Sequence, residues 1–399
     1  MKKLLILGGS RYVIPAIKAA KKLGVYVITC DYLPNNIGHK YSDEYHNVSI
    51  IDKEAVLELA KELNIDGIIS FATDPGVIVA AYVAEKLGLP TPPYKSVEIL
   101  QNKNLFRDFL EQNGFNVPKH KSFNKNDDIL ENIKEFSFPF IIKPVDSAGS
   151  KGVTRVDNES QIEIALKNAF DHSFNGKIIV EEFIQQKGCS SDTDSFSIGN
   201  DMVFTSFNRQ YFDKDAENPY TPAYYIWPSN IKSDKQRELK KELNRLIKLL
   251  NMGTSIYNIE TRVGVNDKAY IMEVSPRAGG NRLSEILNLA TGQDLITNSI
   301  KASLGMELEE LSDPIYDGYW AEYVIHSDNE GVFEGLVIDS NVVGKYLVET
   351  DLWVKEGDIV HSFSGANETI GTLIFKFDDP EKAESILNDH HNWISIRLK

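Results

Sequence analysis

Tyr257–Arg277, with the sequence YNIETRVGVNDKAYIMEVSPR, decides the fold of this chain of 399 residues. Two runs of alternating apolar residues, at 256–263 and 269–274, flank the sequence GVND, which has polar turn residues. This pattern predicts a β-hairpin. If the strands pair symmetrically about the middle of this turn, Glu260 lies opposite Glu273. Directly opposed side chains in an antiparallel pair have Cβ atoms roughly 4.5–5.5 Å apart.

Two carboxylates held this close repel each other unless a cation lies between them. Mg²⁺ prefers oxygen ligands, takes one or two carboxylates and completes its shell with phosphate oxygens. Ser275 shares the face of Glu273, and Arg277 follows at the strand end, where it can hold an anion. The alternative is a solvent-facing hairpin whose acids never meet, for example because a bulge at Gly264 shifts the register by one residue.

The composition is that of an ordinary globular protein, with 42% hydrophobic and 25% charged residues. A net charge of −15 argues against nucleic acid or an anionic membrane as the main partner. Cys30 and Cys189 are the only cysteines and are expected to be free thiols. The N-terminal apolar run stops at Leu7, too early for a signal peptide, and no run reaches membrane-spanning length, so a cytoplasmic location is expected.

The first ninety residues alternate strand and helix patterns, which predicts a Rossmann-like parallel sheet. The alternative function of this part is dinucleotide binding, but the turn Gly8–Val13 lacks the G-x-G-x-x-G spacing. Thr73–Gly76 follows a strand, at the edge where such sheets contact ligands. The predicted strands span residues 2–7, 25–30, 48–51 and 67–71, and the predicted helices span 14–23, 54–63 and 77–87.

A proline-rich break at residues 89–93 precedes a predicted helix at 96–114 that contains Lys103. Lys143 lies in the apolar strand predicted at 138–145, where a lysine could also be an edge-strand device against aggregation. Asp146–Val153 follows as a small, glycine-rich loop whose backbone N–H groups could fold over phosphates. A plain hairpin loop is the competing interpretation.

The rest of the chain predicts a strand at 177–184, a hairpin at 194–207, a helix at 235–250 and another helix ending near Ala290. From about residue 317 the pattern becomes that of a small α+β domain. Its expected strands lie at 319–326, 335–338 and 372–377, with a helix at 380–387.

This order of two lysines, a Gly/Ser loop, an acidic strand and a paired-acid hairpin with arginine resembles the ATP-grasp superfamily of carboxylate–amine and carboxylate–thiol ligases. The resemblance covers roughly residues 1–310 and is to members such as L-amino-acid ligases, carbamoyl-phosphate synthases and phosphoribosylglycinamide synthetases. It implies an α/β and α+β fold. The implied parts are a Rossmann-like domain at 1–92, an ATP-grasp domain at 93–315 with a lid at about 117–185, and a small α+β domain at 316–399.

The resemblance also implies roles for individual residues. The catalytic candidates are Arg277, which would hold the transferring phosphate, and Lys143. The metal candidates are Glu260, Glu273 and Ser275. The ATP-binding candidates are Lys103 and Lys143 on the phosphates, the covering loop with Ser147, Gly149, Ser150, Lys151 and Gly152, the hinge Glu181, Glu182, Phe183 and Ile184, and Asp192 for the ribose.

Two positions depart from the family pattern. Ser275 stands where the family usually has Asn in E-x-N-P-R, and the acid that binds the ribose is not obvious, so Asp192 or Asp194 is expected to serve. The implied cofactors are ATP and Mg²⁺, with Mn²⁺ as an alternative ion. The implied reaction activates a small-molecule carboxylate as an acyl phosphate, forms ADP, and joins the acyl group to an amine.

Three alternatives stay open at this point. A carboxyphosphate-type or purine-pathway enzyme would use the same superfamily chemistry on bicarbonate. An NAD(P)-dependent oxidoreductase would be built on residues 1–90, and a nucleotide sensor would bind ATP without chemistry. The expected partners are a small carboxylate and a small amine, without nucleic acid or membrane. A homodimer is an expectation from base rates alone.

Overall fold

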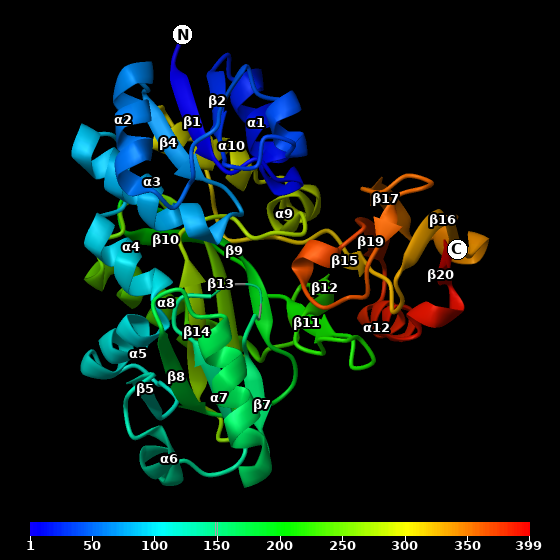
Figure 1. Cartoon of the computed structure of the whole chain (residues 1–399). Helices are drawn as coiled ribbons and strands as arrows, with labels where there is room; N and C mark the ends of the chain where they lie inside the picture. Colours follow the sequence, from blue (N-terminus) through cyan, green and yellow to red (C-terminus); the bar gives the residue numbers. More distant parts are fainter. Residues whose placement is uncertain (148, 150) are drawn as a thin grey trace.

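A computed structural model describes residues 1–147, 149 and 151–399 of the chain (Figure 1). The N-terminal part is a parallel sheet of order β3-β2-β1-β4 with helices on its faces. Its strands are β1 (Lys3–Leu7), β2 (Tyr26–Cys30), β3 (Glu44–His46) and β4 (Gly67–Ser70), and its helices are α1 (Ile14–Lys22), α2 (Lys53–Leu63) and α3 (Asp74–Leu87).

One predicted strand of this sheet is wrong. Residues 48–51 are turn and coil, and the edge strand is Glu44–His46 instead. Ile50 is buried all the same, in the cluster of apolar side chains beneath α2. The apolar pattern therefore predicted burial correctly, but the buried side chain lies in a turn and not in a strand.

The predicted helix at 96–114 is two helices, α4 (Tyr94–Gln101) and α5 (Lys103–Gln112). Asn102 between them has an extended backbone, and its side chain accepts a hydrogen bond from the N–H of Leu105, which caps α5. Asparagine is a favoured N-cap residue because its oxygen satisfies one of the unpaired N–H groups of the first turn. This break places Lys103 at the first position of a helix.

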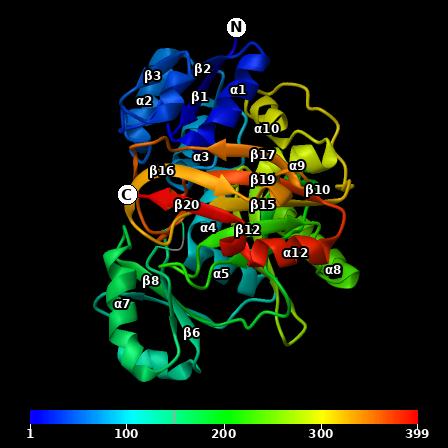
Figure 2. The same ribbon diagram turned by 90° about the vertical axis from the view of Figure 1, so that its right-hand side faces the viewer.

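The segment predicted to be the lid forms a separate antiparallel sheet of order β5-β8-β6-β7. It has its own core, made only of side chains between residues 123 and 180. Figure 2 shows this sheet and α7 at the end of the molecule opposite the first sheet. Its elements are β5 (His120–Asn124), α6 (Ile129–Asn132), β6 (Phe140–Pro144), β7 (Thr154–Val156), α7 (Ile162–Asp171) and β8 (Lys177–Glu182).

The central sheet is antiparallel, of order β10-β9-β13-β14, and contains the organising hairpin. Apolar side chains of α4, α5 and α8 pack against one face of this sheet in a shared core. The elements of this part are β9 (Ser191–Ile198), β10 (Asp201–Thr205), α8 (Ser233–Leu249), β13 (Ser255–Val263), β14 (Ala269–Ser275), α9 (Leu283–Thr291) and α10 (Leu295–Ser303).

The C-terminal part contains a five-stranded sheet of order β11-β12-β15-β19-β17 and a three-stranded sheet of order β18-β16-β20. The hairpin β11–β12 lies far upstream in sequence and pairs with β15, so it joins the C-terminal sheet. These elements are β11 (Arg209–Phe212), β12 (Pro222–Trp227), β15 (Tyr319–Ile325), β16 (Gly331–Ile338), α11 (Ser340–Val343), β17 (Leu347–Leu352), β18 (Ile359–Val360), β19 (Gly371–Phe377), α12 (Pro380–Asn388) and β20 (Ile394–Leu398).

Candidate active site

The hairpin β13–β14 places Glu260 opposite Glu273, the pairing that the sequence predicts. The strands do not pair symmetrically along their whole length. The turn pairs Val263 with Ala269, one residue off, and a bulge at Met272 then restores the register before the two glutamates. A bulge inserts one residue into one strand and re-aims the side chains beyond it, and bulges are common beside active sites. Here it brings two carboxylates together.

A third strand extends the pair into a row. Asp192 of β9 lies opposite Glu260, so Asp192, Glu260 and Glu273 run across three adjacent strands. Two residues along, Asp194, Asn258 and Ser275 form a second row. Because opposed residues and residues two apart share a face of the sheet, all six side chains lie on one face. We call this face the acid face.

The acid face carries more negative charge than its own residues balance. Burial and the neighbouring Glu260 raise the pKa of Asp192 to about 7, and burial raises the pKa of Asp194 to about 6. The Asn258 amide donates to both aspartates, at 2.8 and 3.4 Å. Glu260 has one cationic neighbour, Arg262, at 2.9 Å. A bound cation would relieve this imbalance.

The carboxylates of the acid face suit a Mg²⁺ ion that also has phosphate and water ligands better than a cation held by protein ligands alone. The three carboxylates of the row do not all approach within 4.8 Å of one another. Mg²⁺ is commonly held by one or two carboxylates together with substrate phosphates and water, so two facing glutamates suit it. Glu260 and Glu273 are the residues that would hold the ion, with Asp192 beside them.

Arg277 lies at the end of the hairpin, and its guanidinium forms a bidentate ion pair with Asp74 at the start of α3, at 2.8 and 2.7 Å. Burial acts to raise the pKa of Asp74, but the Arg277 charge and hydrogen bonds from Arg277 and Ser275 lower it below its usual value. The Ser275 hydroxyl donates to Asp74 at 2.9 Å and accepts from Gln101 at 2.7 Å. Ser275 therefore supports Asp74, which in turn fixes the arginine.

Lys143 belongs to a buried ionic cluster with Glu181 and Arg107. The Glu181 carboxylate lies 2.6 Å from the Lys143 ammonium and 2.9 Å from the Arg107 guanidinium. Burial acts to raise the pKa of Glu181, but the two cations hold it at about 2. Arg107 also donates to the carbonyl of Met272 at 2.8 Å, so the same guanidinium supports the bulge that aligns the acids.

The loop that follows β6, which is predicted to cover the phosphates, is tied to α5. Lys103 donates from its ammonium to the carbonyl of Ser147 at 2.7 Å and from its backbone to Val145 at 3.0 Å. Gly152 has a φ of +72°, and a Cβ there would lie 2.8 Å from Pro144, so glycine is required. Gly149 also has positive φ, Lys151 is exposed, and Ser150 lies outside the described residues.

The hinge residues divide between two directions. Glu181 turns inward to Lys143, whereas Glu182 is exposed and accepts from the backbone N–H of Lys119 at 3.3 Å. Phe183 lies under the guanidinium of Arg155, 4.5 Å from its ring centre, and Ile184 is buried. Asp192, which is predicted to bind the ribose, lies in the acid row beside Glu260.

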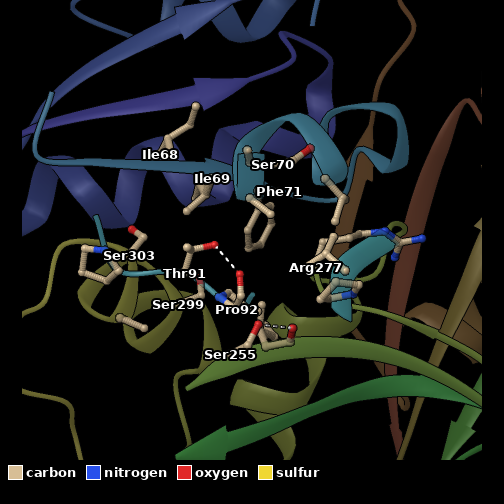
Figure 3. Close-up of a pocket in the computed structure, with 18 of the residues that line it drawn as sticks. Ile68, Ile69, Ser70, Phe71, Thr91, Pro92, Ser255, Arg277, Ser299 and Ser303 are labelled. Carbon is tan, nitrogen blue, oxygen red and sulfur yellow. Dashed lines mark hydrogen bonds between the residues drawn. The ribbon is translucent and has the colours of Figure 1, made fainter. Parts of the chain in front are cut away.

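Two cavities adjoin these groups. One of about 340 Å³ lies between the first sheet and the central sheet, with Ser70 and Phe71 on one side, Ser255 on the other and Arg277 at one end (Figure 3). A second, of about 190 Å³, is lined by Tyr12, Phe71, Gly279 and other residues, so three loops at strand ends converge on it. The charged residues that line the second cavity are Arg11, Lys18, Arg282, Glu285 and Asp351.

Several of these groups were not identified from the sequence. Asp194 was considered only for the ribose, Asp74 was included only as part of the segment Thr73–Gly76 expected to contact ligands, and Asn258 and Arg107 were not singled out. Strand alternation from Glu260 would have pointed to Asn258, and the position just after a parallel strand did point to the segment that contains Asp74. Arg107 gave no signal, because a helix arginine is usually solvated.

This arrangement of acid face, lysines, covering loop and arginine on two facing sheets defines an ATP-grasp fold. Residues 100–281 match the family model described as ATP-grasp domain, so this part of the chain contains the domain that its motifs indicate.

The comparisons with individual proteins agree on the fold. The structure resembles L-amino acid ligase from Bacillus licheniformis, with a TM-score of 0.81, 21% identity and coverage of 100% of this chain and 99% of that one. It also resembles phosphoribosylglycinamide synthetase from Anaerococcus prevotii, with a TM-score of 0.76, 22% identity and complete coverage of both chains. At these identities the likeness concerns the fold.

Among curated proteins, the chain matches the carbamoyl phosphate synthase large chain of Clostridium perfringens, with 22% identity over 75% of this chain. It spans 28% of that protein's length, so it corresponds to one part of it. No helix in the described part of the chain is long and apolar enough to cross a membrane.

Proposed function

We propose that the protein is an ATP-dependent, ADP-forming ligase that activates a small-molecule carboxylate as an acyl phosphate and joins it to an amine. The observation that carries this proposal is the acid face, which has excess negative charge and ends at a buried arginine. Lys103 lies within electrostatic range of both Asp74 and Lys143, so the cationic groups and the acids surround one region. Such a region suits the triphosphate of ATP with its metal ion.

In the proposed reaction, a carboxylate oxygen of the acid substrate attacks the γ-phosphorus of ATP, and ADP leaves with the bonding electrons. The amine then attacks the acyl carbon, phosphate leaves with the bridging oxygen, and the ammonium proton passes to solvent or phosphate. Bound Mg²⁺ would supply charge neutralisation on the phosphates, held by Glu260 and Glu273. Lys103, Lys143 and Arg277 would bind the phosphate oxygens and stabilise developing negative charge.

The loop 146–153 is proposed to cover the phosphates during this reaction. Lys103 holds its first part by the Ser147 carbonyl, and glycines give the rest its turns. Exclusion of water matters because an acyl phosphate hydrolyses when water reaches it. Ser150, Lys151 and Gly149 complete this proposed cover, and Glu182, Phe183 and Ile184 are proposed to contact the adenine.

The second cavity is the proposed substrate site. It combines Arg11, Lys18 and Arg282 with Glu285, charges of both signs that suit a zwitterionic amino acid. Arg282 and Asn281 both have positive φ, at 65° and 49°, which is uncommon for residues other than glycine. Ion pairs of Arg282 with Glu285 at 3.3 Å and Glu349 at 2.6 Å hold this strained turn in place.

We further propose that the chain is divided into a unit at 1–92, a unit at 93–315 with its lid at about 117–185, and a unit at 316–399. The proposed substrates of the whole protein are small molecules. A dinucleotide-dependent oxidoreductase is less well supported, because the N–H of Gly9 in the glycine turn already donates to Asp31 at 2.9 Å. Carboxyphosphate chemistry, as the name of carbamoyl phosphate synthase suggests for that relative, is the second candidate.

The test is product identity with Mg-ATP and pooled amino acids. ADP and phosphate that appear only with added substrate, without added bicarbonate, would support acyl-phosphate ligation. AMP and pyrophosphate would mean adenylation and would contradict the proposal. ADP formation that requires bicarbonate would select the carboxyphosphate candidate instead.

A further inference from the structure

Asp213, His326 and His390 converge in the C-terminal part, away from the acid face. Asp213 directly follows β11, His326 directly follows β15, and His390 follows α12 (Figure 1). The three residues are far apart in the sequence. The five-stranded sheet contains both β11 and β15, and α12 packs against this sheet. Asp213 and His326 are buried, and His390 is half-buried.

The donor atoms of the three side chains point at one another. Nε2 of His326 lies 3.1 Å and Nε2 of His390 lies 3.5 Å from the same oxygen of Asp213, Oδ2. The three donor atoms all lie within 4.8 Å of one another. Donors around a tetrahedral Zn²⁺ ion lie roughly 3.3 Å apart at metal–ligand distances of about 2.0–2.1 Å, so small side-chain shifts suffice.

Two of the three donors are oriented by hydrogen bonds on their far side. His326 Nδ1 lies 2.7 Å from the carbonyl of Val324, which must accept, so Nδ1 carries a proton and Nε2 is the nitrogen that faces Asp213 and would bind a metal ion. Asp213 Oδ1 accepts from the N–H of Asp215 at 2.9 Å, which leaves Oδ2 for the cluster. Metal-binding histidines almost always donate their other N–H to a carbonyl or carboxylate in this way.

An ion pair between Asp213 and a protonated His326 explains two of the residues but not the third. His390 directs a second imidazole nitrogen at the oxygen that His326 already contacts. Burying a second positive imidazole there would need another counter-charge, whereas two neutral imidazoles and one carboxylate are a common donor set for transition metals.

We propose that Asp213, His326 and His390 bind a divalent transition-metal ion, for which Zn²⁺ is the best match, with the remaining position taken by water. The ion would fasten the loop 213–221 to the C-terminal sheet. Asn218 of this loop already donates twice to the segment between β18 and β19, to the carbonyls of Phe363 at 3.3 Å and Ser364 at 3.1 Å. The Phe363 ring in turn stacks on His326, with ring centres 4.2 Å apart.

The test is direct Zn²⁺ binding by the full chain. Protein treated with a chelator and then dialysed is titrated calorimetrically with Zn²⁺ in excess Mg²⁺, so that the acid face is already occupied. We expect one Zn²⁺ per chain in the wild type and at least tenfold weaker binding in His390→Ala. The control is His361→Ala, which removes an exposed histidine paired with Glu330 in the same part of the chain.

Co²⁺ provides a second readout, because its visible absorption reports nitrogen ligands. Wild-type protein should show a Co²⁺ band that Zn²⁺ abolishes and that His390→Gln lacks, while circular dichroism shows both proteins folded. Absence of Zn²⁺ binding in the wild type, or equal affinity in wild type and His390→Ala, would overturn the proposal. Either result is independent of whether ADP is formed.

Discussion

Glu181 and Glu273 both lie on strands of the ATP-grasp domain, but their charges are balanced in different ways. Glu181 has two cations of the chain itself within 2.9 Å, and its pKa is held at about 2. Glu273 belongs to a row of three acids in which Asp192 has a pKa raised to about 7. The charge of Glu181 is balanced by the chain itself, whereas the acid row has excess negative charge that a bound cation would balance. The comparison separates a carboxylate paired before any ligand binds from one that is proposed to hold a metal ion.

The largest effect is expected for Glu181→Gln. The change leaves Arg107 and Lys143 buried without their counter-charge, and breaking a buried ion pair on one side typically costs about 3–5 kcal/mol. Urea unfolding should show this loss. The exposed Glu163→Gln should lie within about 0.5 kcal/mol of wild type, and a Glu181→Gln protein as stable as this control would break the comparison.

Glu273→Gln should behave in the opposite way. Removing one acid from the row relieves repulsion, so stability without Mg²⁺ should not fall. ADP release should fall by about 10²–10³-fold, equivalent to about 2.7–4 kcal/mol of barrier, by analogy with loss of one charge-stabilising group. Rates of ADP release by Glu273→Gln and Glu181→Gln, measured in a coupled assay, check this. A fully active Glu273→Gln would contradict the assignment of the metal site.

The acid dependence of stability sharpens the comparison further. The pKa of Glu181 is lower in the folded protein, about 2, than its ordinary 4.5. Its contribution to stability is therefore fully present above about pH 4.5 and is lost as pH falls towards 2, about 3 kcal/mol in all. The difference in unfolding free energy between wild type and Glu181→Gln should shrink over this range; a constant difference would refute the ion-pair account.

The smallest effect is expected for Ser275→Ala. Its hydroxyl bridges Gln101 and Asp74, so its loss should cost about 1 kcal/mol and slow turnover several-fold through the positioning of Arg277. The apparent Mg²⁺ affinity should stay unchanged. A clear loss of Mg²⁺ affinity would instead make Ser275 a metal ligand, the role that the family pattern implies.

The sequence predicted the parts of this site that depend on local pattern. Strand alternation and a polar turn predicted the pairing of Glu260 with Glu273, which holds because the bulge at Met272 offsets the one-residue shift at the turn. The bulge at Met272 was not predictable, because its carbonyl is satisfied by Arg107 from a distant helix. The position of Asp192 beside Glu260 was not predictable for a related reason, because the register of β9 against β13 depends on long-range strand pairing that no local signal reveals.

The break at Asn102 and the placement of β11–β12 follow the same logic. Asn102 carries a local capping signal, so the two helices could have been separated from the sequence. The hairpin β11–β12 pairs with β15 nearly a hundred residues later, and such pairing is set by tertiary packing. Local chemistry was therefore readable, and partners far apart in sequence were not.

The most direct measurement of the central claim is Mn²⁺ binding in the presence of ADP, followed by electron paramagnetic resonance. Mn²⁺ replaces Mg²⁺ at oxygen sites and reports bound and free ion separately. The account predicts at least tenfold weaker Mn²⁺ binding in Glu273→Gln and unchanged binding in Glu163→Gln. Equal Mn²⁺ affinity in Glu273→Gln and wild type would contradict the claim that the acid face holds the metal ion.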